Sequence, residues 1–147
     1  MIGPKNESEA RKGLRYHVKE IPTADGLSQW HYEETEITPT PNQMLLTRVV
    51  VAKVRSLGQA KDVLRMSPIQ SGQTGWNDVA WVKEALERLK EDRSALGRNA
   101  IEWEAVRDMS ISFCQAKIGS HRFEVDGGFD IKKTPTYSMI ENKETIP

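Results

Sequence analysis

The sequence predicts an α+β fold in which a mainly antiparallel sheet packs against two or three helices. In the first third of the chain apolar and polar residues alternate with a period of two, and a run of β-branched residues follows. From residue 56 onward, apolar residues recur at helical spacing. Strands that come mostly before helices are typical of α+β proteins, in which the two kinds of element occupy separate layers.

Two strands are predicted near the N-terminus. Leu14 to Val18 alternates apolar and polar side chains, and so does the segment that contains Trp30 and Tyr32. The stretch from Thr23 to Ser28 indicates a turn between them, and the charged residues 5–12 indicate a hairpin loop before the first strand. The β-branched run from Met44 to Val54 predicts a third strand, buried on both faces in the middle of the sheet.

Three helices follow. Ser56 is a suitable N-cap for a helix that reaches Met66, and a loop over residues 70–75 separates it from a second helix. We expect the second helix to begin at Asn77 or Asp78 and to end near Glu91. The third is expected to begin with a capping box and to end near residue 118.

The capping box of the third helix would pair Asn99 with Glu102. Beyond Gly119 the pattern weakens, and residues 119–147 predict a partly irregular segment that wraps the body. It would be anchored by single apolar side chains at Phe123, Phe129, Tyr137 and Ile140.

Composition limits the classes of function. The 147 residues fit a single domain, and 21 basic against 21 acidic residues leave no basic footprint for nucleic acid. One cysteine, Cys114, excludes an intramolecular disulfide and predicts a reducing, cytoplasmic setting. No apolar run is long enough for a signal peptide or a membrane span.

The start of the second helix is the strongest candidate site. A helix N-terminus offers unpaired N–H groups and a partial positive charge, and Asp78 would lie there as a candidate catalytic acid. Aspartate is also favoured at this position for local reasons, so Asp78 as a simple helix cap stays open. His17 is the candidate second catalytic residue.

The residues expected to bind a ligand are Trp76, Asn77, Trp30, Tyr16 and His31. The three histidines do not share the spacing of a helical metal site, and no phosphate-binding or dinucleotide-binding glycine pattern is present. We therefore expect neither a metal nor a cofactor.

Ten short motifs together resemble a family of small uncharacterised proteins from filamentous fungi, over nearly the whole chain. They are Tyr16–Glu20, Trp30 with Tyr32–Glu34, Met44–Leu46, Pro68–Gln70, Trp76–Asn77, Ala80–Leu86, Trp103–Asp108, His121–Phe123, Pro135–Tyr137, and Lys143–Glu144 before Ile146–Pro147. In many members a cysteine follows the Trp-Asn pair and a histidine lies on an upstream strand. That arrangement is similar to circularly permuted papain-like thiol enzymes.

This sequence departs from the family pattern at both catalytic positions. Asp78 occupies the place of the cysteine, and Met1 to Pro4 looks like the end of the strand that carries the histidine in longer relatives. The resemblance therefore implies a permuted papain-like fold without thiol peptidase activity. An exposed sheet edge left in this way would favour a homodimer.

Two functions from different classes are consistent with these residues. The first is a cofactor-free enzyme of fungal specialised metabolism, a cyclase, isomerase or cycloaddition catalyst that folds a small apolar molecule in a shaped pocket. The alternative is a non-catalytic pseudoenzyme that acts as a binding or scaffold protein. An apolar cavity lined by Trp76 in front of Asp78 would favour the enzyme, and a filled or solvent-open site would favour the scaffold. A hydrolase that uses Asp78 with His17 ranks last, since no oxyanion site is identifiable.

Overall fold

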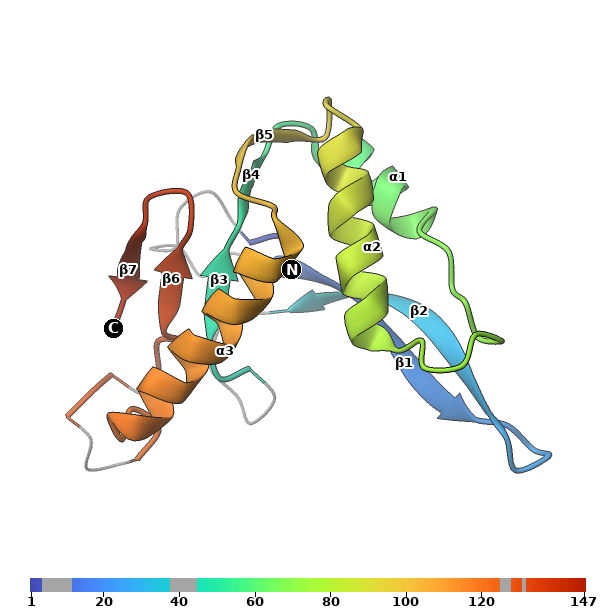
Figure 1. Ribbon diagram of the computed structural model, residues 1–147, viewed down its shortest axis with the longest axis horizontal. Helices are drawn as coiled ribbons and strands as arrows, with labels where there is room; N and C mark the ends of the chain where they lie inside the picture. Colours follow the sequence, from blue (N-terminus) through green and yellow to red (C-terminus); the bar gives the residue numbers. More distant parts are fainter. Residues whose placement is uncertain (4–11, 38–44, 125–127, 131) are drawn as a thin grey trace. The chain divides into compact units, whose positions relative to one another are not determined.

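The computed structural model describes residues 1–3, 12–37, 45–124, 128–130 and 132–147, and it confirms an α+β protein (Figure 1). The chain divides into two compact units. Unit 1 comprises Met1–Thr38 and Val54–Gly97, and unit 2 comprises Pro39–Lys53 and Arg98–Pro147. The chain passes from one unit to the other at residues 38/39, at 53/54 within β4 (Ala52–Val54) and at 97/98 within β5 (Leu96–Asn99).

Unit 1 contains an antiparallel hairpin formed by β1 (Gly13–Pro22) and β2 (Ser28–Ile37). The turn between the strands is closed by a hydrogen bond from the Thr23 N–H to the Leu27 carbonyl, at 2.8 Å. Gly26 has φ +80°, which a glycine adopts without steric cost. Both strands and the turn were expected from the sequence; the loop expected at residues 5–12 lies almost entirely outside the described residues.

Two helices lie on one face of this hairpin, α1 (Leu57–Arg65) and α2 (Asp78–Glu91) (Figure 1). The Ser56 hydroxyl accepts the Gln59 N–H and caps α1, as expected. The predicted start and end of α2 are also confirmed, and the loop before it lies where the sequence placed it.

Side chains of alternate hairpin residues hold the helices in place. The Tyr32 ring contacts the Trp81 ring of α2 at 5.9 Å between centroids, and Trp81 is only 2% exposed. Glu34, on the same face of the hairpin, pairs with Lys61 at 3.1 Å and with Arg65 at 2.9 Å, both from α1. Hydrogen bonding to Lys61 and Arg65 lowers the pKa of Glu34, so this carboxylate stays ionised between its two cations.

Unit 2 contains a three-stranded sheet in the order β3 (Arg48–Val50), β6 (Thr136–Ser138) and β7 (Lys143–Ile146). β3 pairs parallel with β6, and β6 pairs antiparallel with β7. The long helix α3 (Trp103–Gly119) packs on this sheet through Phe113, whose ring lies 5.7 Å from that of Tyr137.

The prediction of one buried central strand at Met44 to Val54 was wrong. Within the described residues, this stretch is split into β3 and β4, and β3 lies at an edge of its sheet while β6 is central. β6 is buried at Thr136 and Ser138, which are 1% and 2% exposed. The β-branched run correctly indicated a strand. Its position at the edge of the sheet follows from pairing with β6, whose buried polar residues lie far along the chain.

The capping box predicted for α3 was also wrong. Asn99 ends β5, the N-cap is Glu102, and no side chain caps the first turn. Asn99 was expected to cap because of its residue type alone, whereas the backbone there continues a strand.

Arg122 organises the C-terminal segment. The residue is 2% exposed, and its guanidinium donates to the carbonyls of Pro147, Asp130 and Lys133 at 2.8–2.9 Å. The Phe129 ring lies 5.0 Å from the guanidinium carbon, in a cation–π contact. The segment expected to be partly irregular thus contains two strands, and buried Arg122 ties together the chain on either side of them.

Candidate functional site

The first turn of α2 is capped by its own side chains. The Asn77 side-chain oxygen accepts the Ala80 N–H at 3.0 Å, and the Asp78 carboxylate accepts the Val79 N–H at 3.0 Å. Both side chains are exposed. Each therefore satisfies a donor that a helix N-terminus leaves unpaired, which is the local role that a cap performs.

Trp76, expected to line a pocket, is buried at 7% exposure and fills the space beside the helix start. Its ring meets that of Trp30 edge to face, with centroids 5.7 Å apart and an interplanar angle of 88°. The indole N–H donates to Glu84 at 3.2 Å. The structure thus brings Trp76 and Trp30, both expected to bind a ligand, together as packing partners of one another.

Tyr16 lies on the helix-facing side of the hairpin, next to Glu34 in the strand register. Its side chain is 7% exposed, and its hydroxyl has no hydrogen-bond partner among the described residues. Burial, with the negative charge of Glu34, raises the pKa of Tyr16 to about 12. The phenol is consequently neutral throughout the physiological range.

His17 and His31 lie on the opposite face of the hairpin from Tyr16 and Tyr32, because neighbouring strand residues point to opposite sides. The His17 ring nitrogen Nε2 lies 3.1 Å from the Glu33 carboxylate, and burial lowers the pKa of His17. His31 is exposed. The structure therefore does not bring His17 to Asp78, which starts a helix on the other face.

The outer edge of β1 was a candidate for dimerisation. Leu14 exchanges two backbone hydrogen bonds with Ile2 along this edge, at 2.8 and 2.9 Å. Tyr16 and Val18 follow at two-residue steps and point their backbone groups to the same edge, yet they are 7% and 3% exposed. Because these residues are buried, the edge is covered there. Pairing of this edge with a second copy stays a prediction, and the burial of Tyr16 and Val18 does not favour it.

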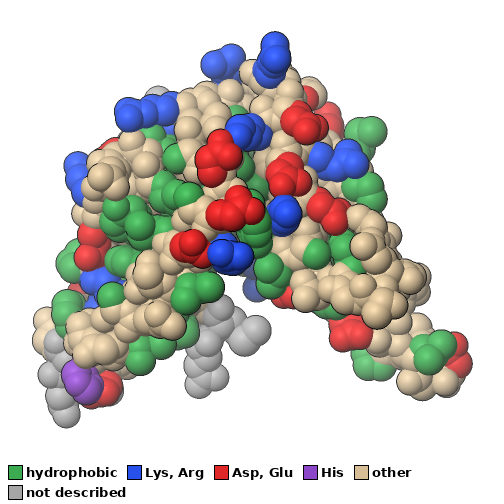
Figure 2. Space-filling view, in the orientation of Figure 1, with side chains coloured by type: hydrophobic (Ala, Val, Ile, Leu, Met, Phe, Trp, Pro, Cys, Tyr) green, Lys and Arg blue, Asp and Glu red, His purple; other side chains and the backbone are tan. Residues whose placement is uncertain are grey.

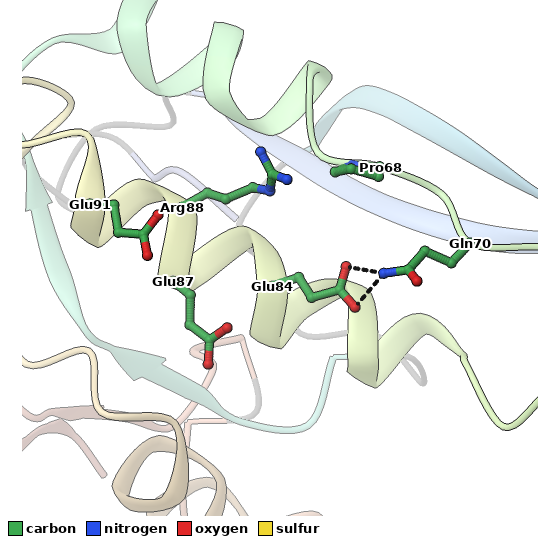
Figure 3. Close-up of a pocket in the computed structure, with 6 residues that line it drawn as sticks. All are labelled: Pro68, Gln70, Glu84, Glu87, Arg88 and Glu91. Carbon is green, nitrogen blue, oxygen red and sulfur yellow. Dashed lines mark hydrogen bonds between the residues drawn. The ribbon is translucent and has the colours of Figure 1, made fainter. Parts of the chain in front are cut away.

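A groove of about 370 Å³ runs along α2, on a flank that the sequence analysis did not select (Figure 3). Its lining is polar: the Glu84, Glu87, Arg88 and Glu91 side chains from α2, and Pro68 and Gln70 from the preceding connection. Arg88 extends toward the segment that carries Pro68 and Glu84 points toward Gln70, while Glu87 and Glu91 point away from that segment (Figure 3).

Glu84 joins the groove to the predicted site. Its two carboxylate oxygens accept from the Gln70 side-chain amide at 2.9 and 3.0 Å, and one of them also accepts from the Trp76 indole. The carboxylate therefore lines the groove on one side and fixes Trp76 on the other.

The groove carries more negative than positive side chains. Its lining contains three carboxylates and one guanidinium, and in the space-filling view acidic side chains, with basic ones between them, lie over α2 (Figure 2). Glu87 is 4.0 Å from the ammonium of Lys83, an exposed pair that contributes little. No group of three His, Cys, Asp or Glu side chains within the described part of the chain is arranged to hold a metal ion.

Glu84, Glu87 and Arg88 were not among the candidate site residues predicted from the sequence. The signal was present, because Glu84, Glu87 and Glu91 follow each other at intervals of three and four residues and so share one helix face. Gln70 could not be found in this way, since only the folded loop brings it to Glu84.

The chain belongs to a family that is described only as a family of unknown function, DUF6914, which matches residues 1–146. No curated protein and no solved structure matches the chain. Among the described residues, no helix is both long and apolar enough to cross a membrane.

Proposed function

We propose that this DUF6914 protein is a non-catalytic binding protein whose acidic groove on α2 holds a basic segment of a partner protein. The observation that carries the proposal is the lining of the groove, which contains the carboxylates of Glu84, Glu87 and Glu91 and the guanidinium of Arg88. A lysine or arginine side chain complements this charge, whereas nucleic-acid phosphates would be repelled by it.

The helix start supports binding over catalysis. Asp78 is exposed and accepts a helix N–H, and Trp76 is packed between Trp30 and Glu84. A small apolar substrate would need the space that Trp76 itself fills. The filled helix start therefore favours the scaffold alternative over the cyclase or isomerase hypothesis.

The size of the groove suits side chains of a peptide. Its volume of about 370 Å³ lies at the lower end of the range for ligand pockets, roughly 300–1,000 Å³. Arg88, beside Pro68, can bind a backbone carbonyl or an acidic side chain of the same peptide. We infer a ligand in which basic residues dominate and one hydrogen-bond acceptor lies next to them.

The permuted papain-like arrangement inferred from the sequence is part of the same proposal. It is supported by the position of Asp78 in the first turn of a helix packed on a hairpin. On this account the fold persists without the thiol, and the outer flank of the helix that once carried the thiol binds the partner.

The test is fluorescence anisotropy of a labelled oligoarginine peptide with the full-length protein. Glu87→Gln together with Glu91→Gln should weaken binding by about tenfold or more, because two of the three groove carboxylates are lost. The matched control removes the same charge elsewhere, with Glu104→Gln and Glu141→Gln, and should change affinity by less than about threefold. Equal losses in both pairs, or no binding at all, would contradict the proposal.

A further inference from the structure

Within the connection between α1 and α2, the loop of residues 70–76 is fastened at both ends to one carboxylate. Gln70 begins the loop and Trp76 ends it, and both donate to Glu84. Between them, the Gln73 N–H bonds to the Gln70 carbonyl at 2.9 Å and the Trp76 N–H bonds to the Gln73 carbonyl at 3.1 Å. The loop is therefore two consecutive turns closed by a single side chain of α2.

The loop has few other attachments among the described residues. Residues 71–75 are exposed, and Gly75 has φ +83° at the point where the chain turns into Trp76. Trp76 is the one deeply buried residue of the segment, at 7% exposure. Loss of the bonds to Glu84 would leave the loop held mainly by the contact of Trp76 with Trp30.

The acceptor sites on Glu84 are nearly all used. A carboxylate has about four lone-pair sites, two on each oxygen. On Oε1 both are taken, by Gln70 and Trp76, while on Oε2 one is taken by Gln70 and one is left. A lysine ammonium can use the remaining site, but a guanidinium that binds both oxygens must displace a donor from Oε1.

We propose that Glu84 is a latch: an arginine side chain bound in the groove displaces the Trp76 indole from Oε1 of Glu84 and releases the loop, whereas lysine binds without releasing it. This rests on the proposed binding function and adds a conformational response to it. The response discriminates between two basic side chains of equal charge, because a guanidinium that binds both oxygens needs more acceptor sites on Glu84 than are free, whereas an ammonium needs only one. Release would uncover Trp30 and the start of α2 for a second contact with the partner.

The experiment follows the Trp76 indole N–H in ¹H–¹⁵N spectra of the full-length protein, assigned with Trp76→Phe. Saturating oligoarginine should shift this resonance and speed its hydrogen exchange by about tenfold, since the bond to a charged acceptor is lost. Saturating oligolysine should change the exchange by less than about twofold. If oligoarginine binds and the indole exchange does not change, or if oligolysine speeds it equally, the latch is wrong while the groove stands.

If neither peptide binds, the proposed function is wrong. Variants of the free protein still test the hydrogen bond on which the latch depends. In the free protein, Glu84→Ala should speed exchange of the Trp76 indole N–H by about tenfold. Glu91→Gln changes the same groove without touching the loop and should leave that exchange unchanged. Unchanged exchange in Glu84→Ala would overturn the latch.

Discussion

Trp76 gives the sharpest test of whether the helix start is filled or is a pocket. With 7% of the residue exposed, Trp76→Ala removes nearly the whole buried side chain. Truncation of a buried tryptophan costs about 3–5 kcal/mol. Trp76→Phe keeps an aromatic ring against Trp30 but removes the indole N–H, and Glu84 retains the Gln70 amide. We expect Trp76→Phe to cost about 1 kcal/mol.

Both variants are measured by urea unfolding followed by far-ultraviolet circular dichroism. Trp103, only half-buried at the start of α3, serves as the matched tryptophan, and its alanine variant should cost clearly less than Trp76→Ala. If Trp76→Ala costs less than about 1 kcal/mol, the residue does not fill the space beside Asp78. A pocket there would then have to be reconsidered, and with it the enzyme hypothesis.

Three further predictions concern the cap, the buried phenol and the C-terminal segment. Asn77→Ala should lower the free energy of unfolding by about 0.5–2 kcal/mol, and Asp78→Asn by less than about 1 kcal/mol, in the same urea assay; the reverse order would contradict the capping roles. Tyr16 has its pKa raised to about 12 in the fold, so stability should fall as pH rises from about 10 to 12. Tyr16→Phe should reduce that fall and the late step in a phenolate absorbance titration, leaving the part due to Tyr32, whose pKa burial also raises. The cost at neutral pH should be small because the Tyr16 hydroxyl has no hydrogen-bond partner among the described residues. Arg122→Lys keeps the charge but cannot reach three carbonyls in the same geometry; it should cost more than about 2 kcal/mol and speed amide exchange in β7, whereas wild-type exchange would refute its organising role.

Local signals in the sequence were sufficient for most elements of unit 1. The start of α2 is set by Asn77, whose side chain accepts an N–H three residues later, and this depends on nothing outside the helix. The hairpin follows from alternation and from a turn that contains Gly26. Such features are encoded over a few residues, so the sequence alone predicts them.

Unit 2 shows where local reasoning fails. Thr136 and Ser138 are polar, yet they form the central strand of its sheet, because pairing with β3 and β7 buries them. Asn99 looked like a helix cap and instead ends a strand. In each case tertiary pairing overrides the preference of the residue, which a single sequence does not reveal.

The sequence placed the candidate site at the first turn of α2, whereas the proposed binding groove lies further along the same helix. Asp78 and Trp76 stand out by residue type and place, whereas the groove arises from Glu84, Glu87 and Glu91, ordinary residues for a solvent-facing helix. Their role depends on the loop that folds Gln70 back onto Glu84, fourteen residues away. Long-range closure of this kind leaves no pattern that spacing rules can detect.

The central claim is that the flank of α2, and not its first turn, is the binding surface. Chemical-shift mapping of ¹⁵N-labelled protein titrated with oligoarginine tests it most directly. The account predicts that the largest changes fall on Gln70, Glu84, Glu87, Arg88 and Glu91, with the Trp76 indole following them. Changes centred on Asp78 and Tyr16 with the groove unaffected, or spread evenly over the acidic surface of both units, would contradict it.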